Sequence, residues 1–234
     1  MLLAGGKTTH ATRDYTAPLS ILEPDAIRAG HAYQQWSDVM DVLSEYNART
    51  ELLLKYLTIY HVIENFMFKL PLVRLERQQG GRMFSIRDFR RLYGQIEKSE
   101  TDALRRLIGT LFPLPAGPVT FEQHIVARWM ALPPELAVVD IDQALTALDL
   151  SWRYADFVAG ASAPLFAKLV YSLRNAIVHN KETEFHLTYA SLDATLVGLI
   201  ERFLIPCLEE ICFSLISSPN QQVWYSNREL LLYS

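Results

Sequence analysis

The chain has 234 residues, of which 50% are hydrophobic, and a formal net charge of −4. This size and composition predict one domain with a sizeable core and exclude a disordered or coiled-coil protein. The acidic balance argues against a broad nucleic-acid clamp. No apolar run free of charges reaches the roughly 18 residues of a membrane span, and no signal-peptide pattern opens the sequence, so we expect a cytoplasmic protein with no membrane partner.

Two cysteines, Cys207 and Cys212, lie five residues apart in an apolar stretch that we expect to be helical. Helix geometry separates their Cα atoms by about 8 Å. This separation is beyond the reach of a disulfide, so reduced thiols are the expected state.

Apolar residues recur at helical spacing through most of the sequence. We expect a flexible tail over residues 1–19, a helix over about 25–46, and a second helix over 50–70 that is apolar around most of its circumference. Gly80 and Gly81 break the chain, and Ser85 is a suitable N-cap for a long helix that continues to about Phe112. Prolines and a glycine between 113 and 118 end that helix.

Helices are expected in the second half over about 119–131, 140–156, 163–178 and 192–216. Pro164 suits the first turn of the third of these, and Asn180 suits its C-terminal cap. A short extended piece over 184–189 precedes the last helix, which Pro206 bends or splits.

The predicted fold class is therefore all-α. A single domain is expected over 20–216, with 74–160 as a helical elaboration inside it and 217–234 as a C-terminal segment.

Basic residues are concentrated between Arg74 and Arg106, where nine arginines and lysines accompany five acidic residues. Arginines interleaved with aromatic side chains suit phosphates and stacked bases, which makes Arg87, Arg90 and Arg91 candidate nucleic-acid contacts. A solvated amphipathic helix is the alternative interpretation.

The stretch "YSLRNAIVHNKETE", residues 171–184, ends the helix expected over 163–178. At about 100° per residue, the apolar residues of this helix share one arc, and Arg174, Asn175 and His179 lie on the other side. The last turn of a helix favours a protonated imidazole. A cationic histidine next to a guanidinium is a poor pair in water, but the two can hold a phosphate between them.

The segment "RNAIVH" resembles the R-x4-6-H signature, often with Asn after Arg, of the HEPN superfamily (higher eukaryotes and prokaryotes nucleotide-binding domains). The resemblance covers residues 25–70 and 160–216. It implies a helical bundle that dimerises, with the motif on a late helix and two motif copies in a shared cleft. It also implies a metal-independent endoribonuclease, acting as a toxin or an antiviral-defence effector, with an antitoxin or a defence protein as a possible partner.

Carried over residue by residue, the resemblance makes Arg174 and His179 the catalytic pair and Asn175 their polar support. Arg174 would stabilise the charge that develops on phosphorus, and His179 would act as general acid or base. The 2′-OH of RNA is the nucleophile, so a cyclic 2′,3′-phosphate is the expected product. Lys181, two residues after the motif, is a further candidate RNA contact.

A narrow polar stripe on the helix over 50–70 contains His61 and Glu64, which could support the pair if the two helices are neighbours. A plain solvent-facing stripe is the alternative. Tyr60 and Tyr171 are expected to be buried with satisfied hydroxyls. No third ligand accompanies His61 and Glu64 at helical spacing, so we predict neither a metal site nor a cofactor.

Two other hypotheses remain open from the sequence. The chain could be a non-catalytic HEPN-like module that binds a partner protein, such as a nucleotidyltransferase or a defence sensor. It could also be an unrelated helical scaffold in which "RNAIVH" occurs by chance.

Overall fold

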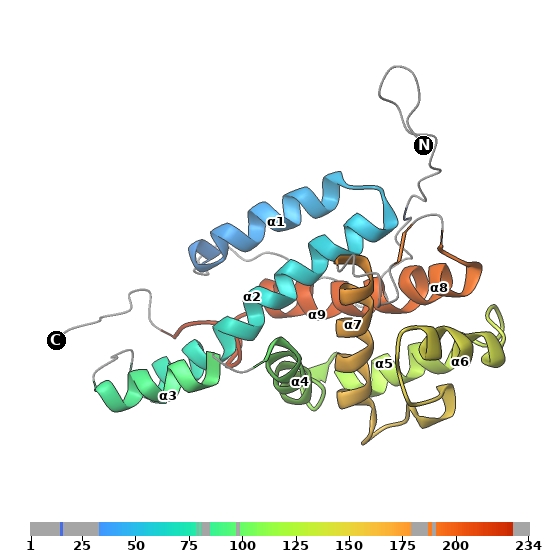
Figure 1. The fold of residues 1–234 in the computed structure, drawn as a ribbon. Coiled ribbons are helices and arrows are strands. Elements are labelled where there is room, and N and C mark those ends of the chain that lie inside the picture. Colours follow the sequence, from blue (N-terminus) through green and yellow to red (C-terminus); the bar gives the residue numbers. More distant parts are fainter. Residues whose placement is uncertain are drawn as a thin grey trace, which may run out of the picture.

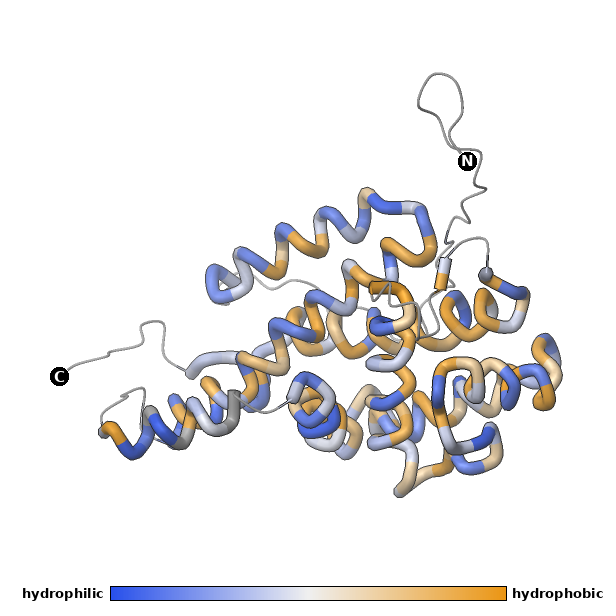
Figure 2. Tube along the Cα trace, viewed as in Figure 1, coloured by the Kyte–Doolittle hydropathy of each residue, from blue (hydrophilic) through white to orange (hydrophobic). Residues whose placement is uncertain are grey.

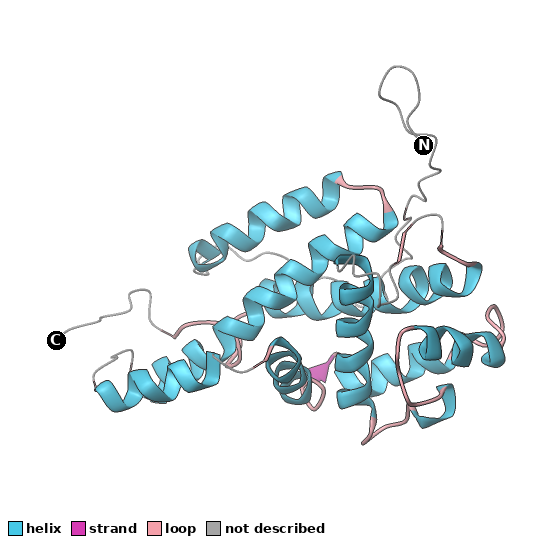
Figure 3. Cartoon of the chain, in the orientation of Figure 1, coloured by secondary structure: helices cyan, strands magenta, loops and turns pink. Residues whose placement is uncertain are grey.

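The computed structural model describes residues 15, 33–78, 80, 85–96, 99–178, 187–188 and 191–226. In these ranges the chain is mostly helical, which confirms the predicted all-α class (Figures 1 and 3). The predicted tail, apart from Tyr15, lies outside the described residues. So do the predicted cap at Asn180 and most of the 184–189 piece.

The described residues of the first half form a 3₁₀ turn and four helices: η1 (Tyr33–Trp36), α1 (Ser37–Ala48), α2 (Leu52–Gln78), α3 (Ile86–Ile96) and α4 (Glu100–Leu111). A small antiparallel hairpin follows, made of β1 (Pro115–Ala116) and β2 (Val119–Thr120). The sequence did not predict this hairpin, which Gly117 helps to turn with a φ of 68°.

The second half contains α5 (Phe121–Met130), α6 (Val138–Ala147), the 3₁₀ turn η2 (Tyr154–Asp156), α7 (Ser162–Val178), α8 (Ala194–Gly198), the π-helical turn η3 (Leu199–Leu204) and α9 (Ile205–Ser217). The helices predicted over 119–131 and 163–178 are confirmed within two residues at each end. The helix predicted over 140–156 is too long, because the chain leaves α6 and Asp149 adopts a left-handed φ of 57°.

The single long helix expected from Ser85 to Phe112 is wrong, because the chain forms α3 and α4 instead. Ser85 does cap α3, since its Oγ accepts a hydrogen bond from the Asp88 N–H at 3.1 Å. A second cap, Ser99, accepts from the Asp102 N–H at 3.3 Å and starts α4. The new helix start places Glu100 in the first turn of α4.

Two prolines show where helical periodicity alone gives the wrong helix end. The helix predicted to stop at residue 70 continues through Pro71 to Gln78, because Val73 and Leu75 beyond the proline are buried in the core. Pro206 has no N–H for the carbonyl four residues earlier. The chain before it forms a π-helical turn, in which the Ile205 N–H donates to the Ile200 carbonyl.

Helix α2 is the central element of the fold and contacts α1, α3, α4, α7 and α9 (Figures 1 and 2). Most of its side chains are buried, as its apolar circumference predicts. Leu104 and Leu107 of α4 and Trp129 of α5 belong to the same core cluster as the α2 residues. The segment over 74–160 therefore helps to build the main core.

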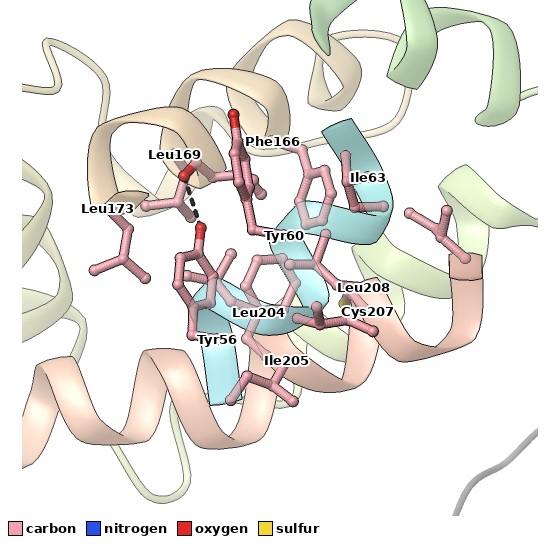
Figure 4. Close-up of a cluster of buried hydrophobic side chains, with 14 of the residues drawn as sticks. Tyr56, Tyr60, Ile63, Phe166, Leu169, Leu173, Leu204, Ile205, Cys207 and Leu208 are labelled. Atoms are coloured by element: carbon pink, nitrogen blue, oxygen red, sulfur yellow. Dashed lines mark hydrogen bonds between the residues drawn. The ribbon is translucent and has the colours of Figure 1, made fainter. Parts of the chain in front are cut away.

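A tight apolar cluster joins α2 to α7 and to the helices at the C-terminal end (Figure 4). In this cluster the buried Tyr56 hydroxyl donates to the Val170 carbonyl of α7 at 2.6 Å. Cys207 and Cys212 are both buried and free, as their spacing predicts. Among the helices that the structure describes, none is both long enough and apolar enough to cross a bilayer.

Candidate functional site

Helix α7 carries the described part of the candidate motif and is held by its inner face and by its N-terminal end. Phe166, Leu169 and Leu173 are buried on its inner face, as the predicted apolar arc requires. At its N-terminal end, the Ser162 hydroxyl donates to the Glu122 carboxylate at 2.6 Å. Lys168 on the opposite side is exposed. Arg174 lies at the margin between these faces, with 21% of its side chain exposed.

The guanidinium of Arg174 faces oxygen atoms from three side chains. Its Nη1 donates to the Asn175 amide oxygen at 3.2 Å. Its Nη2 lies 3.6 Å from Oε1 of Glu64 on α2, and its Nε lies 3.6 Å from Oε1 of Glu100 on α4. The structure thus brings together three sequence-predicted site residues, Arg174, Asn175 and Glu64, and adds Glu100.

Glu100 is held from two directions. The Tyr60 hydroxyl donates to its Oε1 at 2.7 Å, and the N-terminal end of α4 provides the partial positive charge that favours a carboxylate there. The ring of Tyr60 also lies beneath the guanidinium, with Cζ of Arg174 5.8 Å from the ring centroid. Burial and the bond to Glu100 raise the pKa of Tyr60, so this hydroxyl stays protonated and remains a donor.

The pKa of the Glu64 carboxyl is raised above its ordinary value. Burial raises the pKa of its carboxyl, and Glu100 raises it further through charge repulsion and a hydrogen bond between the two carboxyls. His61 and Arg174 act in the opposite direction. The neighbouring carboxylate of Glu100 thus disfavours ionisation of Glu64, whereas the guanidinium of Arg174 favours it.

His61 lies at the outer edge of the cluster. Its Nε2 is 3.9 Å from Oε2 of Glu64, and 61% of its side chain is exposed. Tyr60 is buried with a satisfied hydroxyl, as predicted, whereas Tyr171 is only half-buried.

The other predicted site residues are not part of this cluster. His179 and Lys181 lie outside the described residues, as does the side chain of Arg91. Arg87 and Arg90 are exposed in the first half of α3, and Figure 1 shows α3 at one end of the molecule, away from α7. Within one chain, these arginines do not adjoin Arg174.

Sequence reasoning missed Glu100 because the predicted helix ran through it. The signal was present as "SETD" over residues 99–102, a serine followed three residues later by an acid, which is typical of a helix start. Tyr60 is four residues before Glu64 and therefore shares its helix face. The placement of α4 beside α7 is a tertiary contact that no local pattern encodes.

A second charged cluster lies between α5 and α9. The carboxylate of Glu210, with 5% of its side chain exposed, contacts both Arg128 and His124, and the distance from His124 Nε2 to Oε2 is 2.6 Å. Because Glu210 is buried, His124 and Arg128 are largely covered, and the carboxylate is paired on both sides, this cluster is best explained as a structural ion pair of the core.

The cluster around Arg174 has the composition of an anion site that is occupied by the protein's own carboxylates. A guanidinium flanked by an amide and a tyrosine can bind a phosphate, provided that the phosphate displaces or outcompetes Glu64 and Glu100. No group of three or more His, Cys, Asp or Glu side chains arranged for a metal ion occurs in the part of the chain that the structure describes.

The chain matches no protein-family model, no curated protein and no solved structure with which it was compared.

Proposed function

We propose that this chain is a metal-independent endoribonuclease of the HEPN type that acts in the cytoplasm as a toxin or an antiviral-defence effector. The observation that carries the proposal is the meeting of Arg174, Asn175 and Glu64 at one partly exposed edge. The sequence predicts all three as site residues, and they come from two different helices. Their convergence supports a site at the "RNAIVH" motif.

RNA cleavage by its own 2′-OH needs orientation, charge stabilisation and proton transfer. Arg174 provides the cation for the charge that develops on the phosphate oxygens. Asn175 holds the guanidinium in register, and His179, five residues after Arg174 in the sequence, serves as general acid or base. The products are a cyclic 2′,3′-phosphate and a 5′-hydroxyl.

The exposed face of α2 supports the homodimer that this mechanism uses. Leu54, His61 and Phe68 recur every seven residues along α2 and are exposed to 38%, 61% and 51% respectively. This stripe borders Glu64, so a second copy packed on it would place a second motif near the first. Arg87, Arg90, Arg91 and Lys181 are the proposed contacts to flanking RNA.

The test is cleavage of a mixed-sequence RNA in EDTA, with detection of 2′,3′-cyclic ends. We expect Arg174→Ala and His179→Ala each to lower the rate at least about 100-fold, as loss of a charge-stabilising or proton-transfer group does. Arg105→Ala is the matched control, because Arg105 is an exposed arginine that pairs with Asp102 on α4. Cleavage by a folded Arg174→Ala/His179→Ala double variant at the wild-type rate would refute the proposal.

One observation favours a second candidate, a non-catalytic module that binds a nucleotidyltransferase, an antitoxin or a defence sensor. All three nitrogens of Arg174 face side-chain oxygens of the same chain, as expected of a structural ion pair. In that case, the purified chain leaves RNA intact and co-purifies with another protein at a fixed ratio. An Arg174→Ala variant would then lose stability at neutral pH, because Glu64 and Glu100 would be left together without a cation.

A further inference from the structure

The carboxyl pair beside Arg174 has a consequence for any anion that approaches the guanidinium. Glu64 and Glu100 come from different helices, and each faces a different nitrogen of Arg174 at 3.6 Å. With both carboxyls ionised, the group of three side chains carries a net charge of −1 and repels an anion. With one shared proton, the group is neutral and repels it less.

The positions of the carboxyl groups are set by the fold. Tyr60 anchors Oε1 of Glu100, and α4 begins with the Ser99 cap immediately before Glu100. Glu64 faces His61 and Tyr60 from its own helix, Glu100 from α4 and Arg174 from α7. Glu100 is therefore held in place beside the guanidinium.

We infer that Glu100 is a positioning residue of the Arg174 site: with Glu64 it holds the guanidinium above Tyr60 and competes with an incoming phosphodiester for it. The site consequently accepts the anion most readily when the carboxyl pair carries a proton. This inference rests on the proposed function only in taking a phosphodiester as the anion. The competition itself is a property of the three side chains.

The first test concerns the protein without RNA and uses the carboxyl ¹³C signal of Glu64 as a function of pH. In the wild type we expect a midpoint above the ordinary range of glutamate. Glu100→Gln should lower this midpoint, because a like charge is removed, and Arg174→Gln should raise it, because an opposite charge is removed. Asp102→Asn removes a charge from the same turn of α4 without touching Arg174, and should leave the midpoint unchanged.

The second test measures binding of a short 2′-O-methyl oligonucleotide between pH 5 and 8 by fluorescence anisotropy. A His179→Ala background removes the titration of that imidazole. We expect affinity to fall as the pH rises, and Glu100→Gln to flatten this fall and to tighten binding at pH 7.5 about fivefold or more, the effect of one unit charge about 4 Å away in water. Asp102→Asn should keep the parent slope.

Tyr60→Phe provides a second variant in case Glu100→Gln alters the fold. It keeps every charge but releases Oε1 of Glu100, so it should lower the Glu64 midpoint less than Glu100→Gln does. A Glu64 midpoint that neither Glu100→Gln nor Tyr60→Phe moves would overturn the inference, as would an unchanged pH slope of binding in a folded Glu100→Gln protein.

The two proposals fail in different ways. Absence of cleavage, together with an oligonucleotide affinity that Arg174→Gln leaves unchanged, would refute the proposed ribonuclease function. Inorganic sulfate then replaces the oligonucleotide as the anion, and tighter binding of sulfate to Glu100→Gln than to Asp102→Asn still supports the competition. Equal sulfate affinity of the two variants counts against it.

Discussion

Arg174 shows how one residue can belong to a structural cluster and to a candidate site at the same time. Its side chain is 21% exposed, so it is reachable from solvent, but each nitrogen already faces a protein oxygen. An exposed ion pair contributes about 0–1 kcal/mol to stability. A partly buried cation between two carboxylates contributes more, because its removal leaves like charges together. Activity measurements on Arg174 variants therefore need a parallel stability measurement.

The neighbours of Arg174 also show which of its contacts the sequence predicts and which it does not. Asn175 is its chain neighbour, and Glu64 stands out as a charge on an otherwise apolar helix, so both were accessible to pattern reasoning. Glu100 reaches Arg174 through the packing of α4 on α7, across more than 70 residues of sequence. Helical periodicity gives the face of a residue on its own helix but not the helix it will meet.

Lys69 provides a residue-scale prediction on pH dependence. Its side chain is 6% exposed, its Nζ donates to the Gln35 carbonyl at 2.7 Å, and it lies 3.3 Å from the centroid of the Trp36 ring. Burial lowers the pKa of this ammonium group to about 8. Above that pH the folded state has lost the proton while the unfolded state keeps it until its ordinary pKa of 10.5. Stability therefore rises with pH in this window.

We expect the free energy of unfolding to increase by about 1–2 kcal/mol between pH 7.5 and 9.5, less than the full shift implies because part of the ammonium remains solvated. This rise in stability ends near pH 10. At that pH the tyrosines of the unfolded chain ionise, whereas buried tyrosines of the folded protein, such as Tyr46 and Tyr60, stay protonated. Urea unfolding at the two pH values measures the rise. Lys69→Met should remove most of it and the exposed-site control Lys168→Met should not. An undiminished rise in Lys69→Met would contradict the prediction.

At the scale of elements, helix existence was predictable and helix ends were not. The apolar spacing of α2, α5 and α7 places each of them correctly along the chain. The ends depend on single residues whose effect the core can override: α2 continues through the buried Pro71, whereas the chain before Pro206 adopts a π-helical turn. The missed break before α4 depended on Ser99, a cap that resembles an ordinary polar residue within a helix.

The junction between α8 and the loop after α5 gives an element-scale prediction. A Cβ on Gly198 would lie 2.8 Å and 2.9 Å from the two methyl carbons of Leu136 and 3.3 Å from its Cγ. Leu136 is buried, so rotating its side chain does not clear the space. We expect Gly198→Ala to lower the free energy of unfolding by about 1–3 kcal/mol.

Gly109→Ala is the matched control for this substitution. Gly109 is exposed in α4, and a Cβ there meets nothing within 4 Å. Replacing it removes flexibility from the unfolded chain and should raise stability by about 0.5–1 kcal/mol. Equal effects of the two substitutions in urea unfolding would show that α8 does not pack on Leu136 as described.

At the scale of the whole molecule, the arginine-rich surface and the exposed apolar stripe lie on different parts of the protein. The arginine-rich α3 lies at one end of the molecule (Figure 1), whereas the exposed stripe of Leu54, His61 and Phe68 runs along the central α2. An RNA strand that contacts both α3 and Arg174 of one chain would have to cross the face next to α4. In a homodimer, the partner's α3 offers a second route to the same cleft.

The α2 stripe leads to a prediction of the oligomeric state, which can be tested directly. Phe68 is 51% exposed at the C-terminal end of this stripe, and burying it against a second α2 would remove a large aromatic surface from water. We expect the purified protein to be a dimer by light scattering, and Phe68→Glu to convert it to a monomer by placing two like charges near the symmetry axis. Cleavage should fall together with dimerisation, because the proposed cleft uses both motif copies.

Val139→Glu is the control for this substitution, since Val139 is 65% exposed on α6, away from the stripe. It introduces the same charge at an exposed apolar residue and should leave both the dimer and the cleavage rate unchanged. Because both positions are exposed, neither substitution should change the free energy of unfolding of the monomer, measured in urea, by more than about 0.5 kcal/mol. A Phe68→Glu protein that remains dimeric would show that the dimer interface lies elsewhere. A monomeric Phe68→Glu protein that cleaves RNA at the wild-type rate would show that the site is complete within one chain.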